Sequence, residues 1–115
     1  MIDRVLVPMD HSPLARRALE FALDVHPTAD LVVLYVVDYV EESYAAEMLL
    51  GREELRARAT ARADRLFEDA ADVAAAYGRT LHTVIEFGDP ARTIVEYVDE
   101  ADIDLVVMGS HGRTF

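Results

Sequence analysis

The feature that most constrains the fold is a continuous apolar run, Leu31–Val37, in which seven consecutive residues are Leu, Val or Tyr. The run is too short to span a bilayer, which needs ~20 residues. It also lacks the alternation of polar and apolar residues that is typical of a strand with one solvent-exposed face. We therefore predict a strand buried on both faces, as in the centre of a parallel sheet covered by helices on each side.

Three other short segments have strand-like patterns: Ile2–Val7, Leu81–Phe87 and Leu105–Met108. The first ends at a proline. Leu81–Phe87 mixes polar and apolar residues, so we expect it nearer an edge of the sheet.

Three helical patterns lie between these strands. The first is predicted to begin with Ser12 as N-cap and Pro13 in the first turn, and the last repeats this arrangement at Asp89. The middle helix is expected over Arg52–Tyr77, with Gly78 as the terminating residue. The apolar faces expected from the spacing are Leu14, Ala18, Phe21, Ala22 and Val25, then Leu55, Ala59, Leu66, Ala70, Val73 and Tyr77, then Ile94, Val98 and Ala101.

The element order is therefore βαβαβαβ, which predicts an α/β fold with a doubly wound parallel sheet and right-handed crossovers. We expect a single domain over residues 1–115, with the first strand central. The pattern of residues 39–50 assigns no element to that segment.

Composition excludes several classes of function. The net charge is −11, all 11 basic residues are arginine, and the chain has neither lysine nor cysteine. A lysine nucleophile, a P-loop lysine and a thiolate metal site are absent from this sequence, and the acidic balance argues against a nucleic-acid partner. No signal peptide or membrane span is expected, so a cytoplasmic location fits. The acidic, lysine-free composition favours adaptation to high salt, with GC-rich codon bias as the alternative.

Two predicted strand ends carry the candidate binding residues. Parallel α/β sheets bind ligands at the carboxyl ends of their strands. The first strand leads into Pro8, Met9 and Asp10, and the last leads into Met108–Arg113. Because both loops lie at the same edge of the predicted sheet, they can form one pocket.

Each of these motifs has two interpretations. Gly109 and Gly112 could bring backbone N–H groups close to a phosphate, with Arg113 adding a charge-assisted contact, or they could form only a tight turn. Asp10 could accept hydrogen bonds from a ribose or base, or belong to a local turn. A metal site from Asp10 with His11 and His111 is the least favoured hypothesis, because the histidines lack a ligand spacing.

Catalytic motifs are missing. The loop after the first strand has no glycine, which excludes a dinucleotide-binding fingerprint. No Gly-x-Ser-x-Gly elbow and no His–Asp spacing supports a triad, so we predict no catalytic residues.

Three segments resemble the universal stress protein family. Arg4–Ser12 resembles its opening strand and proline–x–aspartate–x–serine turn, Leu31–Asp38 its second strand, and Asp104–Arg113 the signature after its fourth strand. The resemblance implies a flavodoxin-like sheet of five strands and, in many members, ATP binding.

The resemblance also assigns roles to individual residues. It implies that Asp10 meets the adenosine, with Pro8 and Met9 shaping the wall, and that Val36 contacts the adenine. Ribose and phosphates, with Mg²⁺ entering through the phosphates, would be wrapped by Met108, Gly109, Ser110, His111, Gly112 and Arg113.

The sequence departs from the family pattern at its C-terminal end. The second half of the glycine motif, the last helix and the fifth strand do not occur in these 115 residues, so we expect a C-terminally incomplete domain. The resemblance implies a homodimer in the complete protein. The expected function is an ATP-binding stress-response regulator without fast catalysis, although slow ATP hydrolysis remains open. The alternative is a member that acts through protein–protein contacts without a nucleotide.

The acidic composition generates a testable prediction. Raising salt shortens the Debye length from ~10 Å at 0.1 M to ~3 Å at 1 M and so screens self-repulsion. At a net charge of −11 we expect both the melting temperature and the affinity for anionic ATP to rise between 0.05 M and 1 M KCl. A melting midpoint that stays flat or falls over this range contradicts salt adaptation and leaves codon bias as the explanation.

Overall fold

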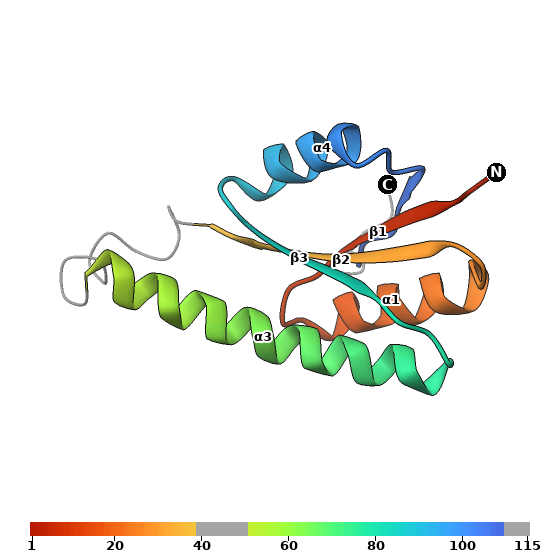
Figure 1. The fold of residues 1–115 in the computed structure, drawn as a ribbon, viewed down its shortest axis with the longest axis horizontal. Helices are drawn as coiled ribbons and strands as arrows, with labels where there is room; N and C mark the ends of the chain where they lie inside the picture. The colour runs from red at the N-terminus through yellow and green to blue at the C-terminus, as the bar shows by residue number, and fades with distance from the viewer. Residues whose placement is uncertain (39–50, 110–115) are drawn as a thin grey trace.

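The fold is a three-layer α/β arrangement, seen in a computed structural model that describes residues 1–38 and 51–109. The strands are β1 (Arg4–Pro8), β2 (Asp30–Val37), β3 (His82–Phe87) and β4 (Leu105–Val106). The helices are α1 (Pro13–Val25), α3 (Arg52–Ala76) and α4 (Pro90–Glu100). Helices α1 and α3 cover one face of the sheet and α4 lies on the other (Figure 1). Within the described residues, no helix is long and apolar enough to cross a membrane.

The sheet has the strand order β3-β2-β1-β4, and every neighbouring pair is parallel. The predicted fold class is confirmed, and β1 is an inner strand with Val5 paired to Leu31 on one side and Leu105 on the other. As expected, β2 is also an inner strand and β3 lies at an edge. β4 is shorter than predicted, although the N–H of Val107 still donates to the carbonyl of Leu6 at 2.9 Å.

Both predicted proline-containing helix starts are present. The Ser12 hydroxyl accepts a hydrogen bond from the N–H of Ala15 at 3.2 Å, and the Asp89 carboxylate accepts one from Arg92 at 3.0 Å. In each helix the following proline occupies the first turn, where its missing N–H removes no intrahelical bond. These caps fix where the loops after β1 and β3 end.

The end of α3 also follows the predicted signal. Gly78 has a φ of +69°, a conformation that glycine adopts without steric cost. Its N–H donates to Ala75 and the N–H of Arg79 donates to Ala74, which are the two hydrogen bonds of a Schellman motif. Gly78 therefore ends the helix and turns the chain toward β3.

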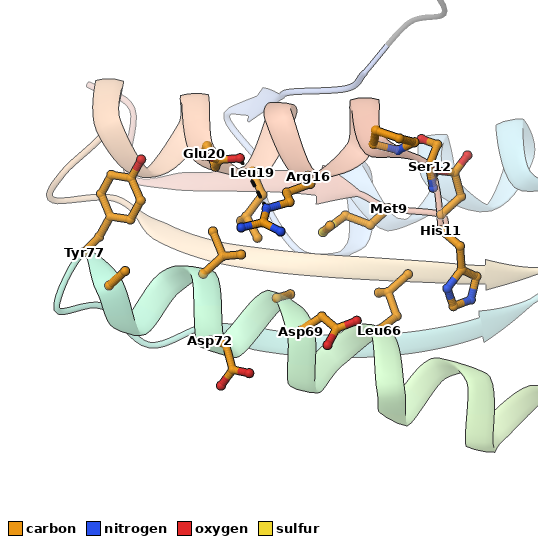
Figure 2. A pocket seen from close by; sticks show the side chains of 15 residues that line it. Met9, His11, Ser12, Arg16, Leu19, Glu20, Leu66, Asp69, Asp72 and Tyr77 are labelled. Carbon is orange, nitrogen blue, oxygen red and sulfur yellow. Dashed lines mark hydrogen bonds and ion pairs between the residues drawn. The ribbon is translucent and has the colours of Figure 1, made fainter.

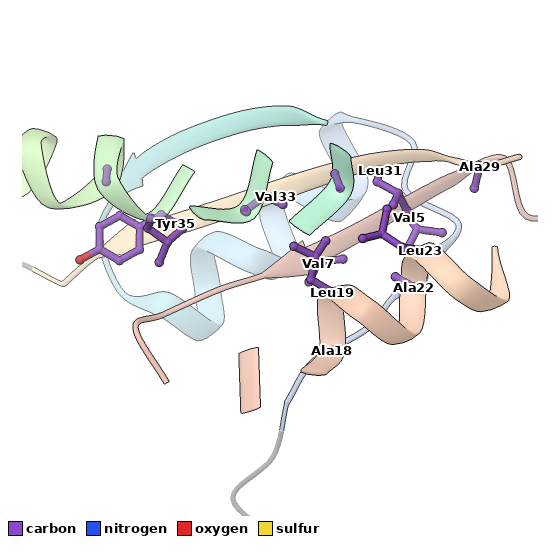
Figure 3. Close-up of a cluster of buried hydrophobic side chains, with 14 of the residues drawn as sticks. Val5, Val7, Ala18, Leu19, Ala22, Leu23, Ala29, Leu31, Val33 and Tyr35 are labelled. Atoms are coloured by element: carbon purple, nitrogen blue, oxygen red, sulfur yellow. The ribbon is translucent and has the colours of Figure 1, made fainter. Parts of the chain in front are cut away.

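The core has two unequal halves because successive strand residues point to opposite faces. The larger half packs side chains such as Val5, Val7 and Leu31 against α1 and α3 (Figure 3). The smaller half contains Leu6, Val32 and Leu34 under α4. No residue of α4 is fully buried, so this face of the sheet is covered less completely. The predicted burial of β2 on both faces is confirmed.

The predicted apolar face of α1 is partly wrong. Its buried residues are Ala15, Ala18, Leu19, Ala22 and Leu23. Phe21 and Val25 are 55% and 48% exposed, because the stripe that meets the sheet is rotated toward the small residues of the helix. On α3 the predicted Ala59, Leu66 and Ala70 are buried, whereas Tyr77 is exposed. The predicted positions of α4 are half-buried. Spacing alone does not show which flank of an amphipathic helix meets the sheet.

Asp104 joins the N-terminal ends of β1 and β4. Its carboxylate accepts hydrogen bonds from the backbone N–H groups of Asp3 at 2.9 Å and Arg4 at 3.0 Å. These two bonds, aided by nearby positive charge, lower the pKa of Asp104 below its ordinary value. The stabilisation from this carboxylate is therefore present at neutral pH and is lost as the pH falls through the lowered pKa.

Arg79 ties the end of α1 to the start of β2. Its guanidinium donates hydrogen bonds to the carbonyls of Leu23 at 3.2 Å, His26 at 3.1 Å and Ala29 at 2.5 Å. Two of these carbonyls lie at the C-terminal end of α1, where no intrahelical donor remains for them. A cation at this end also interacts favourably with the helix dipole.

We expect Arg79→Ala to lower the free energy of unfolding by about 1–3 kcal/mol, because three carbonyls lose charge-assisted donors. Arg79→Lys should retain only part of this stabilisation, since an ammonium lacks the planar, forked donors of a guanidinium. Chemical denaturation measures both. The exposed Arg65 of α3 provides the control, and its alanine variant should stay within about 0.5 kcal/mol of the parent. Equal stability of the Arg79→Ala and Arg65→Ala variants would contradict the role of Arg79.

Candidate functional site

The carboxyl ends of the strands meet at one edge of the sheet and border a cavity of about 780 Å³. The backbone ladder continues past the strands here, with Met9 N–H donating to Leu34 and Gly88 N–H to Val37, each at 2.9 Å. The cavity lies beside the point where the strand order reverses between β1 and β4, which is where open α/β sheets hold ligands.

Six of the ten predicted site residues line this cavity. They are Pro8, Met9, Asp10, Val36, Met108 and Gly109. They come from three strand ends that are far apart in the sequence. The fold therefore brings together residues that the family resemblance assigns to one nucleotide site. The other four predicted residues, Ser110, His111, Gly112 and Arg113, lie outside the described residues, as does segment 39–50.

Asp10 takes part in a local turn and also lines the cavity. Its Oδ1 accepts a hydrogen bond from the N–H of Ser12 at 2.8 Å, which forms an Asx turn just before α1. The side chain is exposed and belongs to the cavity wall. The two interpretations of Asp10 are therefore compatible, because the residue that closes the turn also belongs to the cavity wall.

Gly109 is needed at its position for steric reasons. A Cβ there would lie 2.5 Å from the backbone carbon and oxygen of Leu14, closer than real Cβ atoms approach. The end of β4 therefore packs directly against the first turn of α1. Gly109 has no positive φ in the structure, so close approach and not backbone conformation explains this glycine.

His11 packs against the sheet beside the cavity. Its ring lies edge-on to that of Tyr35, with 5.6 Å between centroids and an angle of 76° between ring planes. Tyr35 is buried in β2, so this contact fixes the loop after β1 to the neighbouring strand. Both rings form part of the cavity wall.

The sequence analysis missed the contribution of α3 and of the β2 and α4 ends. Leu55, Arg58 and Arg62 of α3 line the cavity. Asp38, Pro90 and Ile94 do so from the end of β2 and from α4. The spacing of four between Arg58 and Arg62 places them on one helix flank, but nothing local to the sequence shows that this flank faces the strand ends.

The described residues contain no group of three or more His, Asp or Glu side chains placed to hold a metal ion. The metal hypothesis also involved His111, which lies outside the described residues.

A second hollow, of about 680 Å³, runs between α1 and α3 (Figure 2). It shares the loop residues from Met9 to Ser12 with the first cavity and extends along the helices to Tyr77. We call it the α1–α3 groove. Its walls combine apolar side chains such as Leu19 and Leu66 with the ion pair of Arg16 and Glu20, whose atoms lie 3.5 Å apart.

The family model described as "Universal stress protein family" matches residues 1–115. The chain belongs to the universal stress protein family. Universal stress protein YxiE of Bacillus subtilis is 27% identical over 97% of this chain and 81% of its own length. Universal stress protein MJ0577 of Methanocaldococcus jannaschii is 26% identical over 99% of this chain and 80% of its own.

Solved structures agree with this universal stress protein fold. The structure of MJ0577 superposes with a TM-score of 0.81 over 98% of this chain and 78% of that one. Universal stress protein UspA from Lactobacillus plantarum, 31% identical, superposes with a TM-score of 0.75 over 96% of this chain and 81% of its own.

Two solved structures of the family's fold were described with nucleotides. A universal stress protein in complex with cAMP is 27% identical, with a TM-score of 0.67 over 91% of this chain and 74% of its own. A family protein from Arabidopsis thaliana with AMP bound is 21% identical and superposes with a TM-score of 0.69 over 96% of this chain and 78% of its own. At this identity it supports the likeness of fold alone.

The close approach of Gly109 to α1 predicts that Gly109→Ala destabilises this universal stress protein by about 1–3 kcal/mol, because either β4 or the first turn of α1 must move. Met108→Ala provides a neighbouring control, since the Met108 side chain is exposed and should change stability by less than about 0.5 kcal/mol. Denaturant titration measures both variants. A Gly109→Ala variant as stable as the parent would show that this packing is not required.

Proposed function

We propose that the cavity at the strand ends binds an adenine nucleotide, with ATP as the expected ligand, and that the protein acts as a stress-response regulator. The observation that carries this proposal is the convergence of Pro8, Asp10, Val36 and Gly109 on one cavity at the sheet edge. These residues resemble the nucleotide site of the family in their sequence positions. A family member 27% identical to this chain was solved in complex with cAMP, which supports an adenine nucleotide as the class of ligand.

The shape and lining of the cavity suit a nucleotide. Ligand sites in proteins enclose ~300–1,000 Å³ and combine apolar walls with a few polar groups. At about 780 Å³ this cavity lies inside that range. Val36, Pro90 and Ile94 supply apolar surface for a flat base, and the Asp10 carboxylate supplies an acceptor for a ribose hydroxyl or the adenine amino group.

The start of α1 favours the phosphates. Ser12 and Ala15 at the start of α1 border the cavity. A helix N-terminus carries a partial positive charge that attracts anions. The N–H of Ala15 is already bound by the Ser12 hydroxyl, so the attraction at this end comes from the helix dipole. Such local attraction matters in a chain whose net charge of −11 repels ATP at long range.

Mg²⁺ would enter this site with the phosphates. A magnesium ion keeps several waters and takes only one or two protein carboxylates beside substrate phosphates. Asp38 is a carboxylate of the cavity wall and fits that requirement. When bound, Mg²⁺ would neutralise phosphate charge, and the protein groups would orient the nucleotide.

We propose binding without fast turnover, and slow ATP hydrolysis remains compatible with it. The Asp10 carboxylate, which the resemblance places at the adenosine, accepts a hydrogen bond from the N–H of Ser12 at 2.8 Å. A regulatory role needs a bound nucleotide and not its fast hydrolysis. We also propose that the protein forms a homodimer, as the family resemblance implies.

The second candidate function is protein–protein interaction without a nucleotide. The α1–α3 groove favours it, because apolar side chains such as Leu66 and Val73 line it beside the carboxylates of Asp69 and Asp72. An apolar floor with charged sides is a surface on which a partner segment could dock. The two candidate functions make opposite predictions for nucleotide binding.

Calorimetric titration with ATP and Mg²⁺ separates them. We expect micromolar binding that weakens at least tenfold in Asp10→Ala, because the ribose or base loses its acceptor. Asp10→Asn should weaken binding less, since it keeps an oxygen both for the ligand and for the turn with Ser12. Asp24→Ala, which removes an exposed carboxylate from α1, controls for the change in net charge and should bind like the parent.

Absence of binding heat at millimolar ATP in the folded parent would contradict the nucleotide proposal and favour protein–protein interaction. Equal weakening in Asp10→Ala and Asp24→Ala would place the nucleotide elsewhere on the molecule.

A further inference from the structure

We propose that Arg58 and Arg62 of α3 bind the phosphate end of the nucleotide, so that α3 makes this site selective for phosphorylated ligands over nucleosides. The inference rests on the proposed nucleotide function and goes beyond it, because neither arginine belongs to the strand-end loops from which that function was argued. Arg58 and Arg62 are four residues apart, and both line the cavity.

The charge pattern along α3 supports this assignment. The flank that borders the two hollows carries Arg58 and Arg62 where it faces the strand ends, and Asp69 and Asp72 where it faces the α1–α3 groove. The helix therefore places its basic half at the proposed nucleotide site and its acidic half away from it. A helix whose charged residues served only solubility would not need its arginines and aspartates separated in this way.

The cavity wall differs in charge from the molecule as a whole. The wall contains two guanidinium groups, those of Arg58 and Arg62, and two carboxylates, those of Asp10 and Asp38. The chain as a whole carries −11. Among the described residues, these two arginines are the permanently charged cations of the wall. An approaching phosphate therefore meets its strongest local attraction on α3.

Arg58 can reach a phosphate at small energetic cost. Its Nε donates to the Glu54 carboxylate at 3.3 Å, in an exposed pair whose side chains are 56% and 54% accessible. Exposed pairs of this kind contribute only ~0–1 kcal/mol. The bond uses one of the five N–H donors of a guanidinium, and a doubly charged phosphate is a stronger acceptor than a single carboxylate.

Arg62 is less exposed to solvent than Arg58. Its side chain is half-buried, one turn further into α3 than Arg58 and next to the buried Ala63. A partly desolvated guanidinium interacts with an anion more strongly than one fully in water. The two arginines thus provide one exposed and one partly desolvated guanidinium on the same helix flank.

The test compares adenosine, AMP and ATP with Mg²⁺ on the full chain by calorimetry. The variants are Arg58→Gln with Arg62→Gln, and Arg65→Gln as the matched control. Arg65 is exposed, lies one turn beyond Arg62 on the same helix, and stands outside the cavity wall, so its variant makes the same kind of charge change. Melting curves check that each variant is folded.

We expect the double variant to bind AMP and ATP at least tenfold more weakly than the parent and to bind adenosine within twofold of it. Arg65→Gln should leave all three affinities within twofold. Replacing both arginines with lysine should give intermediate AMP affinity, because the charge remains while the bidentate fork is lost.

Three results would overturn the inference. Unchanged AMP and ATP binding in a folded double variant would show that α3 does not contact the phosphates. Equal weakening of adenosine would place the arginines at the base or in the fold. Equal weakening by Arg65→Gln would show a general charge effect. If the folded parent binds none of the three ligands, the proposed nucleotide function itself fails, which is a different result from a parent that binds and a double variant that binds equally well.

Discussion

Burial of β1 and β2 on both faces is the constraint on which the rest of the structure depends. Val5, Leu6 and Val7 have no exposed surface, so β1 must have strands beside it and helices above and below it. Parallel neighbours then require a crossover between each pair of strands, which sends every loop after a strand to the same edge. The candidate site lies at that edge, where residues that follow β1, β2 and β4 line one cavity.

The loop after β1 has structural and functional roles in the same few residues. Asp10 closes a turn onto Ser12, Ser12 caps α1, and the His11 ring packs on Tyr35 of the neighbouring strand. Each contact is modest, but together they fix the direction of the Asp10 carboxylate before any ligand arrives. A preorganised acceptor loses less entropy on binding than one on a loose loop.

Arginine supplies all the basic charge of this acidic protein, and its placement is specific. Arg79 spans three carbonyls between α1 and β2, and Arg4 donates to the carbonyl of Ala101 near the start of β4. The planar guanidinium forms several directed bonds at once, which an ammonium cannot do. In this chain without lysine, arginine side chains therefore form hydrogen bonds that connect helices and strands. We propose that those of α3 also contact phosphate.

The sequence by itself determined the order of strands and helices, both proline-containing caps and the glycine end of α3. It also determined six described residues of the candidate site. Periodicity, capping and strand-end loops all depend on residues that are neighbours in the sequence. Only the tertiary structure decided which flank of α1 is buried, leaving Phe21 exposed, and that Leu14 excludes a side chain at Gly109. It also brought Arg58 to the strand ends, although its position in the sequence is far from every strand-end loop that was singled out. These features depend on how helices rotate and lean against the sheet, and that is set by the summed packing of many distant side chains, which no local pattern records.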